Sequence, residues 1–442
     1  MNILVITPEL PWPAETGGKA SQFATLKALA ADHSFRIVVN RASPLLHSLA
    51  SELERELPHV RVARGNCPPP PTNESGSHPG LRQRLRRIVR RILRKELRPD
   101  SPHNGPTHSL KRPYFPFVPL TTETLALIEA NLSWADLIQA EFHESLYAAF
   151  MPVSHKPKIF ICHQAHGRFC QRLYSSEAMA ASGAVEGSTS IAPSFIAATD
   201  TAAAHALEAR CMAGFDHIIT FTEDDQRALW QQDRSLPISV SPFPIPADCA
   251  IVPPVEVRRW DLELVYVGSA VWYPNVQAVQ WFCNHVYPLL RGYHTAETCR
   301  LHVVGHWPEE LRKSIPPGII HFHGYAERIA DVLSGNISIN PVFTGAGLRT
   351  KLLASAACTS PIISTSIGCE GVGLYHGEHC LVADRAEDFA SAILSLMRDQ
   401  PMAALLATRA FEKALQTFGP EAVRQRRNSI YAEVCEQFAS GS

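Results

Sequence analysis

The sequence has no long hydrophobic run and almost no net charge. Its longest apolar stretches stay well short of the roughly 18 residues that a membrane-spanning helix needs. The formal charge is -1 at pH 7, so the chain as a whole has no electrostatic preference for nucleic acids or membranes. The first residues, Met1 to Thr7, have neither a basic region nor the apolar length of a signal peptide. We therefore expect a cytoplasmic protein.

The usual metal and dinucleotide motifs are missing as well. The 11 cysteines are scattered and form no Cys-x-x-Cys pair, which argues against a zinc site or a disulfide framework and fits a reducing compartment. No Asp-x-Asp stands out as a metal site. The first expected strand lacks a Gly-x-Gly-x-x-Gly turn, which disfavours a dinucleotide-dependent dehydrogenase. We expect no cofactor.

Short apolar runs alternate with helical patterns along the chain, which is typical of parallel strands joined by crossover helices. With 442 residues the chain exceeds what one core usually organises, and the pattern restarts after a proline-rich stretch near residue 250. We predict an α/β fold with two Rossmann-like domains, at 1–248 and 249–419, and a last helix within 420–442 that closes the second domain or packs back on the first. The expected strands are Asn2–Thr7, Phe35–Val39, Leu137–Gln139, Ile159–Cys162, His217–Phe221, Leu262–Val267, Leu301–Val304, Ile319–Phe322, Ile337–Pro341, Pro361–Ser364 and Leu381–Ala383.

Two stretches, 66–114 and 178–200, interrupt this alternation and are expected to be surface excursions. The first contains an amphipathic basic insertion at about 80–99. Apolar residues from Leu81 to Leu97 recur at helical spacing, and the opposite face is rich in arginine, with Glu96 as the only acid. Such a helix either attaches to an anionic membrane surface or packs its leucines on the first domain; both interpretations stay open. Nucleic acid is disfavoured because no aromatic residues are interleaved.

Two glycine-containing loops follow expected strands. Gly17 and Gly18, with Lys19 next to them, precede a helix at the carboxyl edge of the first strand, a place suited to an anion or to close approach of a substrate; a simple tight turn is the alternative. In the second half, a loop from Pro341 leads to a helix that opens near Arg349. Cations at a helix amino terminus oppose the dipole, so we expect an anion such as a diphosphate there.

Several segments resemble the retaining GT-B glycosyltransferases of the "glycosyl transferases group 1" family. They occur in the family's order over nearly the whole chain. The resemblance implies two domains facing across a cleft, with the acceptor on the first, a nucleotide-sugar donor on the second, and no catalytic metal. The segments are the opening strand with Gly17-Gly18, Leu264–Ser269 with Pro274–Val276 and Trp281-Phe282, Val303–Gly305, His323–Tyr325, Gly345–Lys351, and Pro361–Thr365 with Gly368–Gly371.

The resemblance also assigns site residues. His163 directly follows the expected strand Ile159–Cys162 and is expected to face the reacting sugar, where it would donate to the sugar or share a proton with the acceptor; ordering of its loop is the alternative. The expected donor and diphosphate residues are Gly268, Asn275, Gly345, Gly347, Arg349, Lys351 and Glu370. The expected acceptor-side residues are Gly17, Gly18, Lys19, Glu141, His143 and His166.

The sequence departs from the family at two positions. Relatives commonly carry glutamates eight positions apart around the second loop, where this chain has Ala346 and Ala354. Loss of the ribose contact at the second position is expected to cost about 1.5 to 3 kcal/mol of donor affinity, and Glu370 is expected to substitute in part. The predicted function is transfer of a sugar from a nucleotide-diphosphate sugar to a glycan, lipid-linked or other acceptor. Its alternatives are an inactive scaffolding relative and a nucleotide-sugar epimerase.

Overall fold

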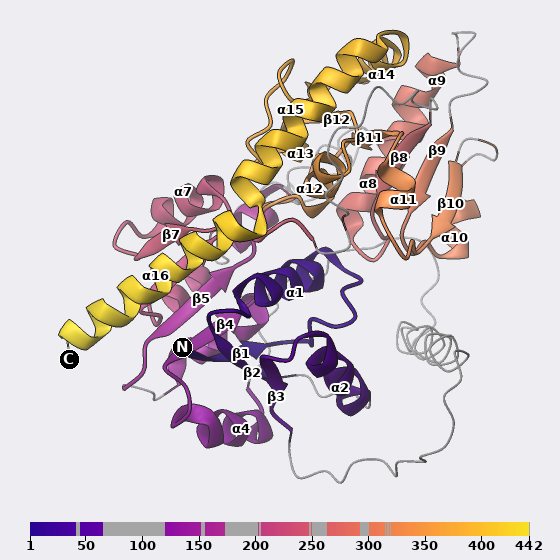
Figure 1. Cartoon of the computed structure of the whole chain (residues 1–442). Coiled ribbons are helices and arrows are strands. Elements are labelled where there is room, and N and C mark those ends of the chain that lie inside the picture. The colour runs from indigo at the N-terminus through magenta and orange to yellow at the C-terminus, as the bar shows by residue number, and fades with distance from the viewer. Residues whose placement is uncertain are drawn as a thin grey trace, which may run out of the picture. The chain divides into compact units, whose positions relative to one another are not determined.

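The computed structural model describes residues 1–40, 45–64, 120–151, 155–172, 202, 205–246, 249, 263–291, 300–313, 315, 318 and 320–441. These residues belong to one compact unit (Figure 1). The predicted basic helix at 81–98 and both predicted surface excursions lie outside them, so membrane attachment stays a prediction. None of the described helices combines the length and the apolar character required to cross a bilayer.

The first half of the chain builds a parallel sheet whose strand order is β3-β2-β1-β4-β5-β6-β7. The order reverses between β1 and β4, which are hydrogen-bonded neighbours, and such a switch point is where α/β proteins bind ligands. The strands are β1 (Asn2–Thr7), β2 (Ser34–Val39), β3 (Val60–Val62), β4 (Leu137–Glu141), β5 (Lys158–Cys162), β6 (His217–Thr220) and β7 (Ile238–Val240). The helices are α1 (Gly17–Leu29), α2 (Leu46–Glu56), α4 (Thr122–Leu132), η1 (His143–Phe150) and α7 (Glu223–Gln232).

The second half builds another parallel sheet, in the order β10-β9-β8-β11-β12-β13, which reverses between β8 and β11. The two sheets confirm the predicted α/β class. The strands are β8 (Leu264–Val267), β9 (Leu301–Val304), β10 (Ile320–Gly324), β11 (Ile337–Asn340), β12 (Ile362–Ser364) and β13 (Leu381–Val382). The helices are α8 (Tyr273–Trp281), η2 (Phe282–Val286), α9 (Tyr287–Leu290), α10 (Glu309–Lys313), α11 (Ala330–Leu333), α12 (Thr350–Ala357), α13 (Ser366–Cys369), α14 (Ala386–Arg398), α15 (Gln400–Phe418) and α16 (Pro420–Gly441).

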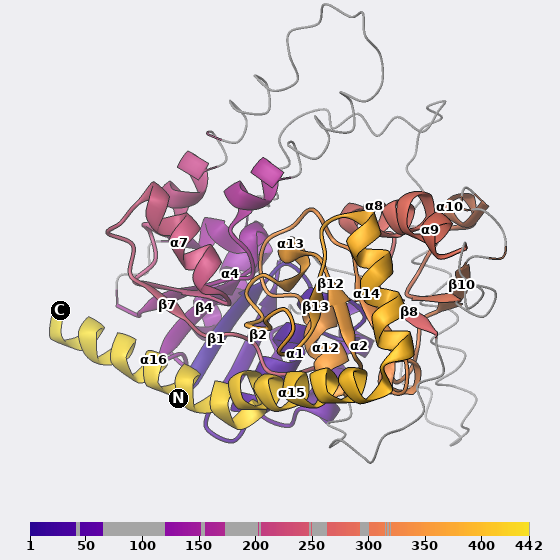
Figure 2. The same ribbon diagram turned by 90° about the horizontal axis from the view of Figure 1, so that it is seen from above.

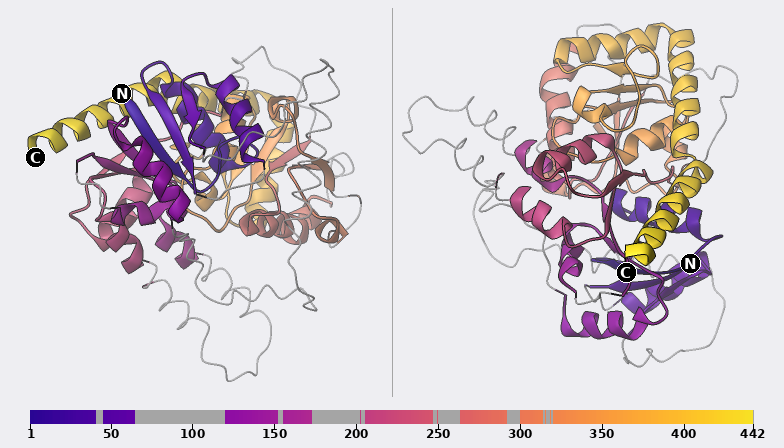
Figure 3. Two further views of the ribbon diagram at one scale, coloured as in Figure 1. Left: turned by 90° about the horizontal axis from the view of Figure 1, so that it is seen from below. Right: turned by 90° about the vertical axis from the view of Figure 1, so that its left-hand side faces the viewer.

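The last two helices meet end to end at Gly419 and Pro420 (Figures 2 and 3). Helix α15 contacts α12 of the second half, and α16 contacts α1 of the first. The buried Tyr431 donates its hydroxyl to Gln139 of β4 at 2.5 Å, and Arg427 donates to the carbonyl of Ser241 at 3.1 Å. Of the two destinations that the sequence leaves open for the last helix, α16 therefore contacts the first sheet.

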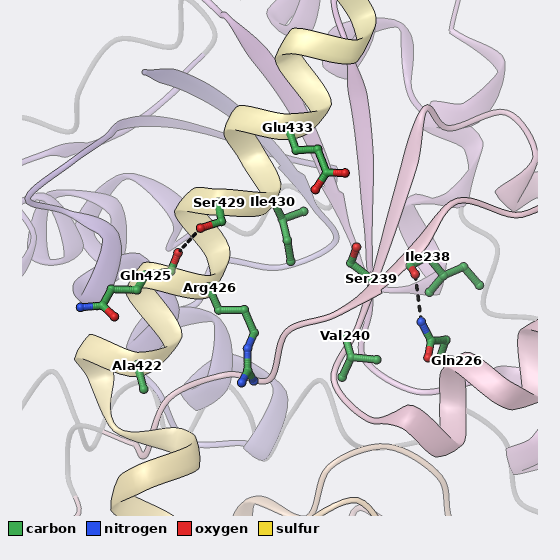
Figure 4. Close-up of a pocket in the computed structure, with 10 residues that line it drawn as sticks. All are labelled: Gln226, Ile238, Ser239, Val240, Ala422, Gln425, Arg426, Ser429, Ile430 and Glu433. Carbon is green, nitrogen blue, oxygen red and sulfur yellow. Dashed lines mark hydrogen bonds between the residues drawn. The ribbon is translucent and has the colours of Figure 1, made fainter.

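A shallow hollow of about 750 Å³ lies between β7, α7 and α16 (Figure 4). It shares no residue with the predicted glycosyl-transfer site. Its lining residues are Gln226, Ile238, Ser239, Val240, Ala422, Gln425, Arg426, Ser429, Ile430 and Glu433.

Candidate active site

His163 is held by a carboxylate from the neighbouring strand. Because β4 and β5 are parallel neighbours, Glu141 at the end of β4 and His163 just after β5 meet at one sheet edge. His163 Nε2 lies 3.0 Å from Glu141 Oε2, and Glu141 also accepts a bond of 2.7 Å from Gln139. A carboxylate accepts, so this bond places the ring proton on Nε2 and leaves a lone pair on Nδ1. Burial lowers the pKa of His163, against the opposing effect of the Glu141 bond, so the ring is neutral at neutral pH.

Phe142 stacks on this histidine from a strained backbone position. Its φ of 64° lies in the left-handed region, which bulky residues rarely adopt. Its ring centroid is 3.7 Å from that of His163, with a 20° angle between the planes. A Cβ on Gly18 would lie 2.9 Å from the Phe142 ring, so only glycine leaves room for the ring. Strain of this kind gathers at functional sites, and here it fixes the His163 ring.

The glycine loop of the second half lies against His163. Gly347 has a φ of 79°, and a Cβ there would lie 2.4 Å from the His163 carbonyl oxygen. On the other glycine pair, a Cβ on Gly17 would lie 3.1 Å from Thr350 Oγ1, in the first turn of α12. Glycine is therefore required at position 347, whereas a larger residue at 17 would displace the Thr350 side chain by a few tenths of an ångström. The structure brings together three predicted segments: Gly17-Gly18, His163 and the loop that contains Gly345 and Gly347.

Arg349 is a half-buried cation without a bonded anion among the described residues. It precedes α12 as its N-cap and donates to the carbonyls of Ala346 at 2.5 Å, Gly347 at 3.2 Å and Ile367 at 3.4 Å. Its Nε has no hydrogen-bond partner in the described part of the chain. Burial lowers the pKa of Arg349 to about 10. A half-buried guanidinium that the described residues pair only with carbonyls fits a site whose ligand is an anion.

Glu370 is bound by two arginines of the first half. Arg172 makes a bidentate pair with it at 2.5 and 2.6 Å, and Arg168 adds a bond of 3.1 Å. Arg172 also donates to the carbonyl of Gly345 at 2.7 Å. Both arginines lie within the helical residues 166–172 that follow His163. Sequence reasoning missed Arg172, although cations four residues apart, close behind a histidine at a strand end, were a usable signal.

Lys351 lies in a polar group with Asn275. Its Nζ donates to Tyr266 Oη at 2.9 Å and to Asn275 Oδ1 at 2.8 Å. Gly268 belongs to the same group because a Cβ there would lie 2.8 Å from the Asn275 side chain. Burial, followed by the charge of Arg349, lowers the pKa of Lys351 to about 7. The predicted donor residues thus form two groups, one around Arg349 and one around Lys351.

His143 and His166 lie behind the His163 loop and are 5% and 3% exposed. His143 Nε2 is 2.7 Å from Glu208 Oε1, and Glu208 also accepts from the backbone of His166 and Gly167. These contacts form a buried network, and the acceptor-side role of the two histidines stays a prediction.

Cys162 lies within metal-ligand reach of His143 and Glu208. However, its thiol donates to the Gln164 carbonyl at 3.1 Å, and burial raises the pKa of Cys162 well above its ordinary value. A metal would need the thiolate, so this geometry favours a structural network. The remaining predicted residue, Lys19, pairs with Glu9 at 3.1 Å.

Residues 261–399 match the family model described as "Glycosyl transferases group 1". A 44.6 kDa protein in the cps region of Klebsiella pneumoniae is 27% identical over 168 residues, which are 35% of this chain and 43% of that relative. This match therefore spans less than half of the relative's length.

Solved structures match the fold over almost the whole chain. HepE from Anabaena in complex with UDP-glucose has a TM-score of 0.61 at 12% identity, covering 98% of this chain and 100% of its own. Sucrose-phosphate synthase from Thermosynechococcus elongatus has 0.62 at 14%, covering 100% of both chains. The pneumococcal O-GlcNAc transferase GtfA, in complex with UDP and GlcNAc, has 0.62 at 11%, covering 98% and 99%. The predicted fold is confirmed: the chain has the two-sheet α/β fold of the GT-B glycosyltransferases, and its segment 261–399 matches the glycosyl transferases group 1 family.

Proposed function

We propose that the protein is a glycosyltransferase that moves a sugar from a nucleotide-diphosphate sugar to a glycan or lipid-linked acceptor, with retention and without a catalytic metal. The observation that carries the proposal is Arg349. Its half-buried guanidinium is bonded only to carbonyls among the described residues, beside a glycine loop that touches His163. The UDP-glucose complex of HepE and the UDP complex of GtfA, which share the fold, support a nucleotide-sugar donor.

In this proposal the diphosphate lies at the start of α12. Arg349 and the loop around Gly345 and Gly347 neutralise the charge that develops on the leaving diphosphate, the role that metal ions play in other transferases. The Nδ1 lone pair of His163 accepts a hydrogen bond from a hydroxyl of the sugar or of the acceptor. Gly18 leaves room for the Phe142 ring that stacks on His163, and Gly17 lets the first loop approach Thr350, on the side proposed for the acceptor.

The missing glutamates shape the donor site. Ala346 and Ala354 are both buried, each 6% exposed, so neither position offers a carboxylate to a ribose or a sugar. We propose that Glu370 accepts from the ribose while Arg168 and Arg172 hold its carboxylate in place. The two alanines also favour the alternative of an inactive scaffolding relative, which would not bind the donor.

Isothermal titration of the purified protein with UDP, GDP and dTDP tests the proposal. We expect micromolar binding of one nucleotide, and loss of that binding in the double variant Arg349→Ala/Lys351→Ala. Activity is then measured with sugar conjugates of the nucleotide that binds. Absence of binding by all three nucleotides would refute the transferase and leave the scaffolding alternative.

Lys351 predicts a pH dependence of donor binding. Since its pKa in the free protein is about 7, it is largely uncharged at pH 8, and a bound diphosphate favours its protonated form. We expect nucleotide binding at pH 8 to take up close to one proton, and affinity to fall by up to about tenfold per pH unit above 7. Titrations in buffers of different ionisation enthalpy measure the uptake. Lys351→Met should abolish it, and unchanged uptake in that variant would assign the proton elsewhere.

The Lys351 amine also affects the stability of the free protein, and the pH dependence of that stability is opposite to the pH dependence of donor affinity. Its folded pKa lies below the ordinary value of 10.5, so between about pH 7 and 10.5 the unfolded chain holds a proton that the folded protein lacks. In this window Lys351 makes the free energy of unfolding rise with pH. Donor affinity and apo stability should therefore change in opposite directions.

A further inference from the structure

Three histidines share one face of the second sheet at its β9–β10 edge. His321 and His323 are two residues apart on the edge strand β10, and His321 lies opposite His302 of β9 in the strand register. Residues two apart in a strand point to the same side, and although the β9–β10 register shifts between Phe322 and Gly324, His321 and His323 both lie on the exposed side of β10. Their neighbours Leu301, Val303, Ile320 and Phe322 point into the core of the second half, so the histidines face the other way.

The three imidazoles are in mutual contact. The ring centroids are 4.4 Å apart for His321 and His323, 4.8 Å for His302 and His323, and 5.5 Å for His302 and His321. His302 Nδ1 lies 2.5 Å from His323 Nε2. On the other side of the His302 ring, Glu263 Oε2 lies 2.6 Å from Nε2. Three imidazoles and one carboxylate are thereby gathered from three adjacent strands or strand ends.

The carboxylate of Glu263 contacts the His302 ring on the side away from His323. Glu263 favours the proton on Nε2 of His302, which leaves the Nδ1 lone pair directed at His323. A carboxylate behind a histidine is the arrangement that orients and strengthens a metal-binding imidazole.

We propose that His302, His321 and His323 bind a divalent transition-metal ion of the zinc type, with Glu263 orienting His302. Imidazole ligands select Zn²⁺, Ni²⁺ and Cu²⁺ over Mg²⁺. The site shares no residue with the candidate glycosyl-transfer site, so the proposal is independent of the proposed function. An ion held there would fasten edge strand β10 to β9, a structural role.

The ion requires movement of both exposed rings. The donor nitrogens of the three histidines do not all lie within 4.8 Å of one another in this structure, so the exposed ring of His321 must turn toward the other two. With metal–nitrogen bonds of about 2.0 to 2.1 Å in tetrahedral geometry, ligand nitrogens lie roughly 3.3 Å apart. His302 Nδ1 and His323 Nε2 must therefore separate by about 0.8 Å from their present 2.5 Å. His323 is exposed, so its ring is free to turn by that amount. A water molecule completes the coordination.

The test is titration of the full chain, purified without a histidine tag and treated with a chelator, with ZnCl₂ and separately with MgCl₂. We expect one equivalent of Zn²⁺ to bind with micromolar affinity and to raise the Tm, and Mg²⁺ to have no effect. His321→Asn/His323→Asn should weaken zinc binding at least tenfold, and Glu263→Gln should weaken it by about 10- to 100-fold. The matched control His285→Asn, an exposed histidine on η2, should bind as the wild type does.

Co²⁺ provides a second measurement on the unmodified protein. A tetrahedral nitrogen site gives Co²⁺ an intense visible absorption band, which one equivalent of Zn²⁺ should abolish. This readout stands even where a variant fails to fold. Zinc affinity that is unchanged in the double histidine variant, or equally reduced in His285→Asn, would overturn the proposal, as would the absence of both zinc binding and the cobalt band.

Discussion

Arg349→Ala is expected to weaken nucleoside diphosphate binding about 100-fold or more while the protein remains folded. In the proposed complex the guanidinium is a buried cation that meets the diphosphate, and truncating one member of a buried charge pair costs about 2 to 5 kcal/mol. At 1.4 kcal/mol per factor of ten, about 3 kcal/mol gives this 100-fold change. Isothermal titration with the nucleotide that binds the wild type measures it.

Two further variants separate charge from geometry. Arg349→Lys keeps the charge but loses the planar fork, so its affinity should lie between those of the wild type and the alanine variant. Arg426→Ala removes an exposed arginine of α16 that lines the hollow in Figure 4, and it should bind as the wild type does. Equal binding by Arg349→Ala and the wild type would remove Arg349 from the diphosphate site.

The free protein should tolerate loss of Arg349 better than the complex does. Burial lowers the pKa of this arginine to about 10 from 12.5, which means that the folded apo state carries an unfavourable desolvation of the cation. The alanine variant loses bonds to three carbonyls but is relieved of that desolvation. We therefore expect a small change in Tm beside a large loss of affinity, a pattern that a general folding defect would not produce.

The fold was largely predictable because the buried parallel strands are continuous apolar runs. The predicted strand Leu301–Val304 coincides with β9, and Ile159–Cys162 with β5 to within one residue. The sequence analysis missed β3 and β7, which have three residues each. Val60–Val62 and Ile238–Val240 are too short for periodicity to separate a strand from a loop, and only pairing with β2 and β6 defines them.

The parts of the site that lie within one short segment of the chain were predictable from the sequence. The local sequence predicts an anion-binding loop, because glycines at 345 and 347 are followed by Arg349. The structure brings that loop to His163. Contacts between distant segments were not predictable. Nothing in the local sequence pairs Arg172 with Glu370 or places His143 on the buried Glu208, because tertiary packing decides which polar group each side chain meets.

The contacts of Lys351 could not be predicted for the same reason, because they too depend on tertiary packing. The sequence placed both cations of the helix start on the diphosphate, since they are only two residues apart. However, Arg349 is the N-cap and has an extended backbone, whereas Lys351 lies within α12, so the two side chains point in different directions. Lys351 accordingly reaches Tyr266 and Asn275, whereas Arg349 stays at the glycine loop. Arg349 is therefore the better candidate for direct contact with the leaving group, and Lys351 for setting its pH dependence.

His163→Ala is expected to lower kcat about 100- to 10,000-fold, the range for loss of a positioned acid or base, with nucleotide affinity nearly unchanged. Gly347 approaches the backbone carbonyl of His163 and not its ring. Removal of the ring therefore leaves the group around Arg349 intact. Release of free nucleotide from the nucleotide sugar, with and without acceptor, measures kcat, and titration measures affinity. His285→Ala, at an exposed position, is the matched control.

Glu141→Gln distinguishes a chemical role of His163 from an ordering role. Glutamine keeps a hydrogen bond to His163 Nε2 but removes the charge that raises the pKa of the ring. If the neutral ring acts on the substrate, the wild-type rate should fall only at pH values below the ordinary histidine pKa of 6.5, and Glu141→Gln should shift this fall to still lower pH. If His163 only orders its loop, kcat should lack an acid limb that moves with Glu141. An unmoved pH profile together with normal kcat in His163→Ala would leave the backbone carbonyl of His163, against Gly347, as the part of this residue that the site uses.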